Sequence, residues 1–259
     1  MERIDLQPGE RLDEVNFRIR LIQRTEGLNF GTDALLLASY IKPSPHATAV
    51  ELGGGSGIIS LLCLARQKVA KVLCAEVQPV YADLIQRNII LNDFSAQMRV
   101  LQADVRDLAR TGEEQGKADI VFTNPPYMKQ TSGAANMAEE KNIARHEVMG
   151  DINDFCAAAA RLLRYGGHFY CVYRTDRMAD LFAALRESKL EPKRLTFVHA
   201  DEAAPPSMLL LDAVAGGKSG MQVTRPLILY KKSEADSRIY TDDMQQVMQN
   251  GRLPQATER

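Results

Sequence analysis

Asn124-Pro125-Pro126-Tyr127 follows the apolar segment 119–123 and contains residue types that can hold a planar nitrogen for reaction. The nitrogen of an aromatic amine or an amide is a poor nucleophile because its lone pair is delocalised. The Asn124 side-chain oxygen and the Pro125 carbonyl oxygen can accept its two hydrogens and aim the lone pair at an electrophile. Pro125 and Pro126 restrict the backbone and so fix these directions, while Tyr127 offers a flat face for an extruded base. These four residues are the predicted catalytic set.

A second motif, Glu51-Leu52-Gly53-Gly54-Gly55-Ser56-Gly57, lies between a predicted strand and a predicted helix. Glycine lacks a Cβ atom, so such a loop lets a ligand approach the backbone closely. Glu76 ends the next predicted strand, where a carboxylate can accept hydrogen bonds from a ribose diol. Nicotinamide dinucleotides and S-adenosylmethionine both fit this logic. The dinucleotide fingerprint fails because its last glycine falls on Ile58, and no P-loop lysine follows.

The spacing G-x-G-x-G after an acid resembles motif I of the Rossmann-like methyltransferases. That resemblance implies S-adenosylmethionine as the cofactor and Glu76 as the ribose ligand. It assigns the methionine end of the cofactor to Glu51 and the loop glycines Gly53, Gly55 and Gly57. It also points to Asp104, after the third predicted strand, as the adenine partner. Because Asp107 is close by and either acid can cap a helix, that last assignment stays open.

These motifs require a sheet edge on which to meet. From Ala47 onward, apolar segments of strand length alternate with amphipathic helical segments, which indicates parallel βαβ units. Segments 208–214 and 227–230 flank a glycine turn at 216–220, which predicts a terminal antiparallel hairpin. Together with the resemblance, the pattern predicts an α/β, Rossmann-like methyltransferase fold. We expect a mostly parallel seven-stranded sheet, with the antiparallel hairpin at one edge and helices on both faces.

Three regions are expected along the chain. Residues 1–30 form an N-terminal strand or hairpin extension, residues 31–232 the methyltransferase domain, and residues 233–259 a polar tail with a short helix from Thr241. Thr32 is expected to cap the helix that follows, with Asp33 in its first turn. The long loop 128–145 beside the catalytic motif is expected to be a substrate lid or a disordered segment.

From about residue 10 to about residue 250, the chain resembles the bacterial tRNA(Val) adenine-N6 methyltransferases. Beyond the two motifs, the match includes 30–38, 144–147, 197–199 and the Gly216-Gly217 pair. The resemblance implies N6-methylation of an adenine in tRNA, next to the anticodon of a valine tRNA. It also implies that Thr32, Asp33 and Asn124 lie close to the cofactor.

Other functions remain open at this point. Release-factor glutamine methyltransferases resemble both motifs, although they carry a sizeable helical domain where this chain has about fifty mixed residues. Guanine-N2 methylation of ribosomal RNA uses the same chemistry. A cofactor-binding RNA-interaction domain without activity is the non-enzymatic alternative, and the presence of Asn124, Tyr127 and Glu76 disfavours it.

The composition narrows the class of protein further. Lys and Arg number 32 against 33 Asp and Glu, for a net charge of -1, so basic residues would have to gather on one face to bind RNA. The histidines are scattered and no Cys-x-x-Cys pair occurs, so we expect no metal site and four buried, reduced thiols. A polar N-terminus and short apolar runs predict a cytoplasmic protein without a membrane span. No pattern indicates the oligomeric state.

Overall fold

The structure is a computed structural model that describes residues 5–16, 19–26, 30–108, 115–126, 150–232 and 238–254, with the Lys232 side chain excepted. Tyr127 of the catalytic motif, the predicted lid at 128–145 and the segment 144–147 lie outside the described residues.

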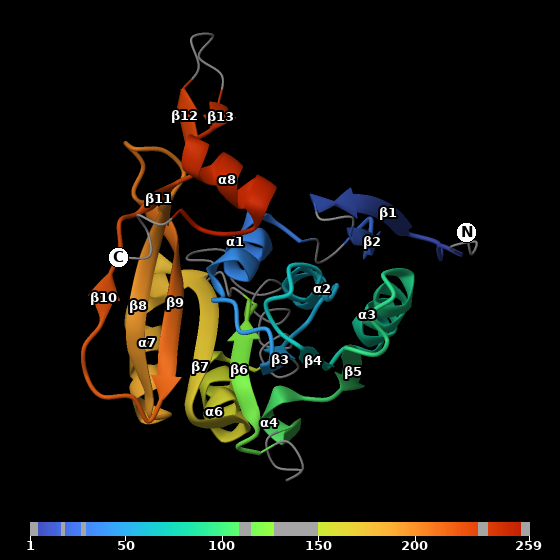
Figure 1. Cartoon of the computed structure of the whole chain (residues 1–259), viewed down its shortest axis with the longest axis horizontal. Coiled ribbons are helices and arrows are strands. Elements are labelled where there is room, and N and C mark those ends of the chain that lie inside the picture. The colour runs from blue at the N-terminus through green and yellow to red at the C-terminus, as the bar shows by residue number, and fades with distance from the viewer. Residues whose placement is uncertain are drawn as a thin grey trace, which may run out of the picture.

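One large sheet runs through the molecule (Figure 1). Its strands are β3 (Thr48–Leu52), β4 (Lys71–Glu76), β5 (Met98–Gln102), β6 (Ala118–Thr123), β7 (Leu163–Arg174), β8 (Leu190–His199), β9 (Pro206–Ala215), β10 (Gln222–Val223) and β11 (Leu227–Ile228). They lie in the order β10-β8-β9-β7-β6-β3-β4-β5, and β11 also pairs with β8. The run from β7 to β5 is parallel, while β9 is antiparallel to both of its neighbours. The predicted fold is confirmed, and β10 and β11 add two short strands to the seven expected.

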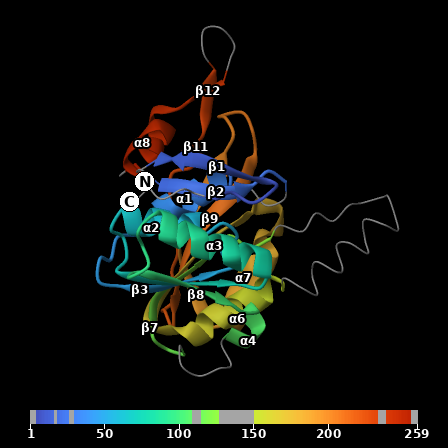
Figure 2. The ribbon, with the colours of Figure 1, turned by 90° about the vertical axis from the view of Figure 1, so that its right-hand side faces the viewer.

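Helices cover both faces of this sheet, and an apolar cluster lies under each layer. One layer holds α1 (Thr32–Tyr40), α2 (Ile58–Ala65), α3 (Pro79–Leu91) and α8 (Asp242–Asn250). The other holds α4 (Val105–Leu108), α6 (Ile152–Leu162) and α7 (Met178–Glu187), which follows a short turn at Thr175–Arg177. Figure 2 shows α2 and α3 on one side of the strands and α4 and α6 on the other. The central strands are buried on both faces, which explains their nearly continuous apolar sequences.

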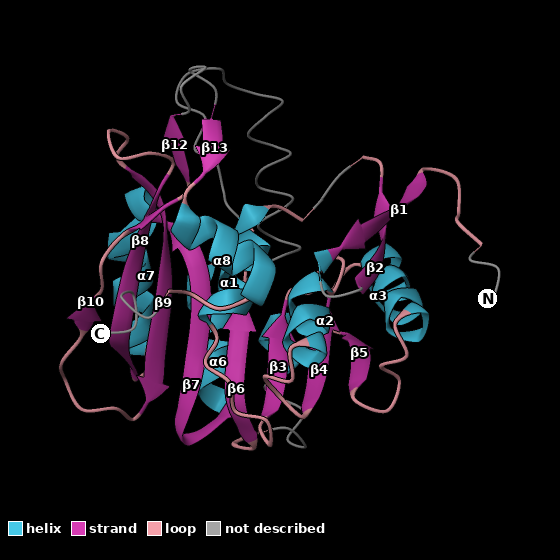
Figure 3. Cartoon of the chain, turned by 45° about the horizontal axis from the view of Figure 1, so that its top comes forward, coloured by secondary structure: helices cyan, strands magenta, loops and turns pink. Residues whose placement is uncertain are grey.

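The N-terminal region forms the predicted hairpin, from β1 (Glu10–Val15) and β2 (Ile19–Arg24). It lies beside α3 (Figure 3), where Asn88 and Asn92 hydrogen-bond the backbone of β2. At the other end, β12 (Tyr230–Lys232) pairs with β13 (Arg238–Tyr240). The short helix predicted from Thr241 is α8, which begins at Asp242 and has Thr241 as its N-cap. Residues of β2 and α8 belong to the same apolar cluster as α1 and α2. The domain boundaries at residues 30 and 232 stay predictions.

Two predictions of local structure are wrong. Residues 227–228 pair in parallel with β8 and not with β9, so the turn at 216–220 does not join a hairpin. The antiparallel hairpin consists of β8 and β9. Turn residues indicate where the chain bends, but pairing partners are chosen by the whole sheet. Thr32 does not cap a helix: it is the first residue of α1, whose N-cap is Gly31 without a side-chain cap bond.

The four cysteines are buried and free, as predicted. Burial raises the pKa of the Cys63 and Cys156 thiols to about 12, so both stay protonated at neutral pH. None of the helices in the described part of the chain has the length and apolarity that crossing a membrane requires.

Candidate active site

The two motifs meet because their strands are neighbours. β3 lies between β4 and β6, so the chain first winds to β5 and then crosses back to β6. In such sheets, ligands bind where the winding reverses, at the carboxyl ends of the strands. The hydroxyl of Thr123, the last residue of β6, donates to the carbonyl of Leu52, the last residue of β3, at 2.7 Å. This bond holds the start of the glycine loop beside the start of Asn124-Pro125-Pro126.

Backbone hydrogen bonds attach the glycine loop to the end of β4. The N–H groups of Gly53 and Gly54 donate to the Ala75 carbonyl at 2.9 and 3.1 Å. A Cβ atom on Gly54 would lie 2.2 Å from the Cys74 sulfur, so only glycine lets the loop pack this closely. Gly55 has a φ of 56°, in the left-handed region that favours glycine, and nothing lies within 4 Å of where its Cβ would be. The backbone at Gly55 is therefore open to a ligand.

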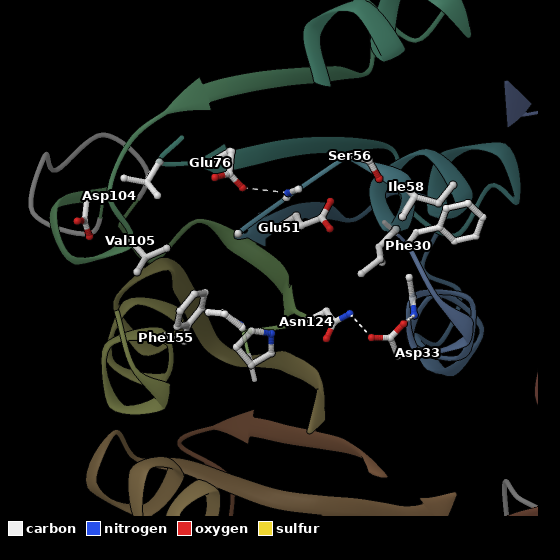
Figure 4. Close-up of a pocket in the computed structure, with 18 residues that line it drawn as sticks. Phe30, Asp33, Glu51, Ser56, Ile58, Glu76, Asp104, Val105, Asn124 and Phe155 are labelled. Atoms are coloured by element: carbon white, nitrogen blue, oxygen red, sulfur yellow. Dashed lines mark hydrogen bonds between the residues drawn. The ribbon is translucent and has the colours of Figure 1, made fainter. Parts of the chain in front are cut away.

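Glu76 closes one side of this loop. Its carboxylate accepts the N–H of Gly55 at 2.9 Å (Figure 4). It also accepts the N–H of Gln78 at 2.9 Å. The residue is 3% exposed, and burial raises the pKa of the carboxyl above its usual value, against the effect of these backbone donors. A carboxylate held by backbone donors at the mouth of a glycine loop is suited to bind hydroxyl groups.

Glu51 lies deeper, at 1% exposure. Its carboxyl accepts hydrogen bonds from the Ser60 hydroxyl and from the Ser60 N–H, the latter at 3.3 Å, and the Cys74 thiol approaches at 3.5 Å. Burial raises the pKa of Glu51 to about 7, although the Ser60 and Cys74 hydrogen bonds lower it. The Glu51 side chain therefore gains or loses its charge near neutral pH.

Asn124, Pro125 and Pro126 directly follow the last residue of β6 and lie across the cavity from the glycine loop. The Asn124 side-chain amide donates to the Asp33 carboxylate at 2.8 Å, across 91 positions of sequence (Figure 4). Asp33 lies in the first turn of α1 and also accepts the N–H of Ala34 at 2.9 Å. The helix start before the glycine loop is therefore in direct contact with the predicted catalytic motif.

Asp104 marks the far end of the site. It accepts the N–H of Arg106 at 2.8 Å and pairs with the Arg106 guanidinium, which lowers the pKa of its carboxyl. Asp104 thus caps the start of α4 and also lines the cavity, so the helix-capping alternative is confirmed and the adenine contact stays a prediction. Phe155 of α6 lines the same cavity (Figure 4) and packs against the loop at Gly53, where a Cβ would be 3.4 Å from its ring.

A cavity of about 300 Å³ joins these groups. Of the predicted site residues, the structure brings the following to its wall: Asp33, Glu51, Gly53, Gly55, Glu76, Asp104, Asn124, Pro125 and Pro126. Thr32 and Gly57 do not line it. A Cβ on Gly57 would meet Ile85 at 3.3 Å, and its φ of 78° fits a tight turn into α2, so this glycine serves the turn and its packing. Tyr127 lies outside the described residues.

Sequence reasoning missed several apolar residues of the wall, among them Phe30, Ile58, Val105 and Phe155. Their sequence signal is that of ordinary core positions, so no local pattern separates them from the core. Phe30 directly precedes the Gly31-Thr32-Asp33 segment, and its N–H is held by the buried Gln23 of β2 at 3.0 Å. Within the described residues, no three His, Cys, Asp or Glu side chains gather into a set that could hold a metal ion.

Comparisons with known proteins find relatives over the part of the chain that contains this site. The family model "Conserved hypothetical protein 95" matches residues 36–150, the segment with both motifs. A protein named tRNA1(Val) (adenine(37)-N6)-methyltransferase from a Flavobacteriaceae bacterium is 24% identical over 220 residues, covering 85% of this chain and 89% of its own. A Shewanella protein of the same name is 26% identical over 165 residues, covering 64% and 68% of the two chains.

Among solved structures, one titled a "predicted O-methyltransferase" from Agrobacterium tumefaciens superposes with a TM-score of 0.67 at 25% identity. The match covers 85% of this chain and 97% of that one. The chain is therefore similar in sequence to the proteins that its motifs pointed to, and its fold matches that of a solved structure over most of its length.

Proposed function

We propose that this chain, a homologue of the bacterial tRNA1(Val) (adenine-N6)-methyltransferases, is an S-adenosylmethionine-dependent N-methyltransferase that acts on an adenine of tRNA. The observation that carries the proposal is the position of Asn124-Pro125-Pro126 at the end of β6, on the wall of the cavity formed by the glycine loop. Curated relatives of this name support the class of enzyme and its cofactor.

The cavity fits this cofactor in size and in chemistry. Its volume of about 300 Å³ is in the range of small-molecule sites. The open backbone at Gly55 and the Glu76 carboxylate suit a ribose, and the carboxyl of Glu51 suits an amino group. Asp104 and the apolar side chains of Val105 and Phe155 suit a purine. When bound, S-adenosylmethionine supplies a methyl group on a positively charged sulfur.

The chain's own groups then orient the acceptor. The Asn124 side-chain oxygen and the Pro125 carbonyl accept the two hydrogens of the amino group, so that its lone pair faces the methyl donor. Pro125 and Pro126 hold these directions through their fixed φ angles. Catalysis is mostly positioning, which converts a bimolecular step into an effectively unimolecular one.

The finer assignment, an adenine next to the anticodon of a valine tRNA, is supported by the names of the relatives and by the match of the motifs. Glutamine in a release factor and guanine in ribosomal RNA also present planar nitrogens. They are the competing acceptors that an experiment must separate.

In the test, the purified protein is given S-adenosylmethionine labelled in its methyl group. Parallel reactions contain one acceptor each: tRNA lacking the modification, ribosomal RNA or a release factor. Digestion to nucleosides with mass spectrometry is expected to give N6-methyladenosine from tRNA alone. Label in protein, in guanosine or on a ribose oxygen would refute the proposed acceptor.

The variant that tests the catalytic role of the motif is Asn124→Ala. It is expected to lower the turnover number by at least about 100-fold, the effect of removing one preorganised group from a transition state. The dissociation constant of S-adenosylhomocysteine should change by less than about threefold, since binding comes from the loop and the acids. An equal loss of cofactor binding would place Asn124 in the cofactor shell instead.

A further inference from the structure

We propose that the end of the cavity formed by Phe30 and Asp33 recognises the positive charge of the cofactor, so that the chain binds S-adenosylmethionine more tightly than S-adenosylhomocysteine. The inference rests on the proposed function, because it takes S-adenosylmethionine as the methyl donor. It goes beyond the closeness to the cofactor that the family resemblance implies for Asp33. It also gives a role to Phe30, which no sequence pattern singled out.

The cavity as a whole suits a positively charged ligand. The described residues that line it include no lysine, arginine or histidine. They include four acids, namely Asp33, Glu51, Glu76 and Asp104. A cavity lined with charges of one sign and with apolar walls raises the local concentration of ligands of the opposite sign. S-adenosylmethionine carries one positive charge more than S-adenosylhomocysteine, at the sulfur that holds the methyl group.

Asp33 brings an unbalanced negative charge to one end of this cavity. Its donors in the described part of the chain are the backbone N–H of Ala34 at 2.9 Å and the side-chain amide of Asn124 at 2.8 Å, and neither donor is charged. Since Asn124 is the proposed contact of the acceptor nitrogen, a carboxylate bonded to Asn124 lies at the end where the methyl group is transferred. The charge of Asp33 is therefore close to the place proposed for the positively charged sulfur.

Phe30 lies at the same end of the cavity. Figure 4 shows Phe30 and Asp33 on the side of Ile58, away from Asp104 and Val105. Ile58 is 3% exposed, so this end of the cavity is apolar as well as acidic. The face of an aromatic ring attracts a cation, and the attraction grows where water is excluded. An aromatic ring and a carboxylate at one apolar end form a pair of groups suited to a sulfonium.

The N-terminal hairpin holds Phe30 in this place. The Gln23 side-chain oxygen accepts the Phe30 N–H at 3.0 Å, and the Gln23 amide donates to the Asp13 carboxylate of β1. Gln23 is buried, so water does not compete for these bonds. The Phe30 side chain packs against the same apolar cluster as β2 and α1. A side chain that is already held loses little conformational entropy when a ligand binds.

The consequence for turnover follows from the change of charge in the reaction. Methyl transfer leaves a neutral sulfur, so Phe30 and Asp33 no longer attract it. The product is then held more weakly than fresh cofactor, which favours their exchange. Glu76 faces a part of the ligand that cofactor and product share, the ribose, so it contributes equally to both. Discrimination therefore belongs to the end of the cavity with Phe30 and Asp33.

The test is titration calorimetry without an acceptor, at pH 8, since burial raises the pKa of the Glu51 carboxyl to about 7. The ligands are S-adenosylmethionine, S-adenosylhomocysteine and sinefungin, an analogue with an ammonium group in place of the methylated sulfur. The unmodified chain is expected to bind both cations at least about fivefold more tightly than S-adenosylhomocysteine, the range of one cation–π contact.

Two variants remove the groups that attract the cation and keep their size. Phe30→Leu keeps an apolar side chain, and Asp33→Asn keeps the shape of the acid. Each is expected to weaken binding of both cations by about 3- to 30-fold, while the affinity for S-adenosylhomocysteine changes by less than about twofold. Phe30→Tyr retains an aromatic ring and should retain the preference. Phe155→Leu is the matched control, because Phe155 is the other aromatic residue among the described residues of the wall and packs at Gly53. It should weaken all three ligands by the same factor.

The outcomes separate this inference from the proposed function. If the unmodified chain binds neither S-adenosylmethionine nor S-adenosylhomocysteine, the proposed function fails. If it binds the two with equal affinity, the cofactor assignment stands and this inference fails. Equal losses for all three ligands in Phe30→Leu and in Asp33→Asn would also overturn it. Circular dichroism checks that each variant is folded, and if Phe30→Leu is not, the ratio of affinities in the unmodified chain and in Asp33→Asn decides.

Discussion

The backbone N–H of Gly55 donates to Glu76 Oε2 at 2.9 Å, and this bond joins the glycine loop after β3 to the end of β4. The other Glu76 oxygen accepts the N–H of Gln78 at the start of α3. A single buried carboxylate thus fixes the turn that approaches the cofactor and the strand end beside it. The shape of the loop and the proposed recognition of the ribose therefore depend on one side chain.

Replacing Glu76 with Ala is expected to weaken binding of S-adenosylhomocysteine by roughly 10- to 100-fold. Hydrogen bonds to charged groups contribute about 1.5–3 kcal/mol each to binding, and the alanine variant also leaves the Gly55 N–H without the acceptor that shapes the loop. Titration calorimetry measures the effect. Asp83→Asn removes an acid from the exposed side of α3, where it pairs with Arg87, and serves as the control with unchanged affinity. Unaltered binding by Glu76→Ala would exclude the ribose role.

The ionisation of Glu51 predicts a pH dependence of stability. The pKa of its carboxyl is raised from 4.5 in the unfolded chain to about 7 in the folded one. Between these values the folded state binds the proton more tightly, so the free energy of unfolding falls as pH rises from about 4.5 to about 7 and then levels off. The pKa shift corresponds to a loss of about 3 kcal/mol at most.

Urea unfolding of the unmodified chain and of Glu51→Gln at pH 5, 6, 7 and 8 measures this dependence. Glutamine keeps an acceptor for Ser60 but has no titrating proton. The stability of the unmodified chain relative to Glu51→Gln should therefore decrease up to about pH 7 and be constant above it. Parallel curves for the two proteins across this range would mean that Glu51 is charged throughout.

How far the sequence predicts this architecture depends on the range of the interactions involved. Periodicity predicted the alternation of strands and helices and placed the segment 119–123 inside β6, because apolar spacing is a local property. The predicted pairing of segment 227–230 with segment 208–214 was wrong, because the pairing of the two-residue strand β11 with β8 depends on how the whole sheet packs.

The candidate site shows the same division between features set by local spacing and features set by long-range packing. The positions of Gly55, Glu76 and Asn124 at the cavity could be predicted because each lies at or just after the end of a predicted strand. The Asp33–Asn124 bond could not, since it joins residues 91 positions apart whose contact exists only after β6 and α1 pack together. Phe30 and Phe155 were missed because an apolar side chain at a cavity wall has the same sequence pattern as one in the core.

The N-terminal hairpin is predicted to support the cofactor site through Asn88. This fully buried side chain donates to the carbonyls of Ile22 and Ser56, at 3.0 Å each, and accepts the Ile22 N–H at 2.7 Å. Ser56 lines the cavity. Asn88→Ala leaves these groups without partners, which costs about 1–3 kcal/mol for each buried group. Stability and affinity for S-adenosylhomocysteine should both fall.

Asn92 provides the matched control, because it bonds the N–H and carbonyl of Arg20 in the same way, while its other hydrogen bond goes to the Asn88 carbonyl and not to the glycine loop. Asn92→Ala should lower the denaturation midpoint while leaving cofactor affinity within about twofold. Equal effects of the two variants on affinity would mean that the hairpin acts only through global stability.

The last prediction concerns Gly54, where a lack of space for a Cβ atom, rather than the backbone torsion, requires glycine. A Cβ atom there would lie 2.2 Å from the Cys74 sulfur and 3.0 Å from Ile85, so Gly54→Ala must push the loop away from β4. We expect a loss of about 1–3 kcal/mol in the free energy of unfolding, as for other overpacked sites, with weaker S-adenosylhomocysteine binding. Cys74→Ala removes the sulfur, so the double variant Gly54→Ala with Cys74→Ala should recover part of both losses. Thermal unfolding and calorimetry on the three variants measure this, and a double variant as weak as the sum of the single ones would show that the Cys74 contact is not the cause.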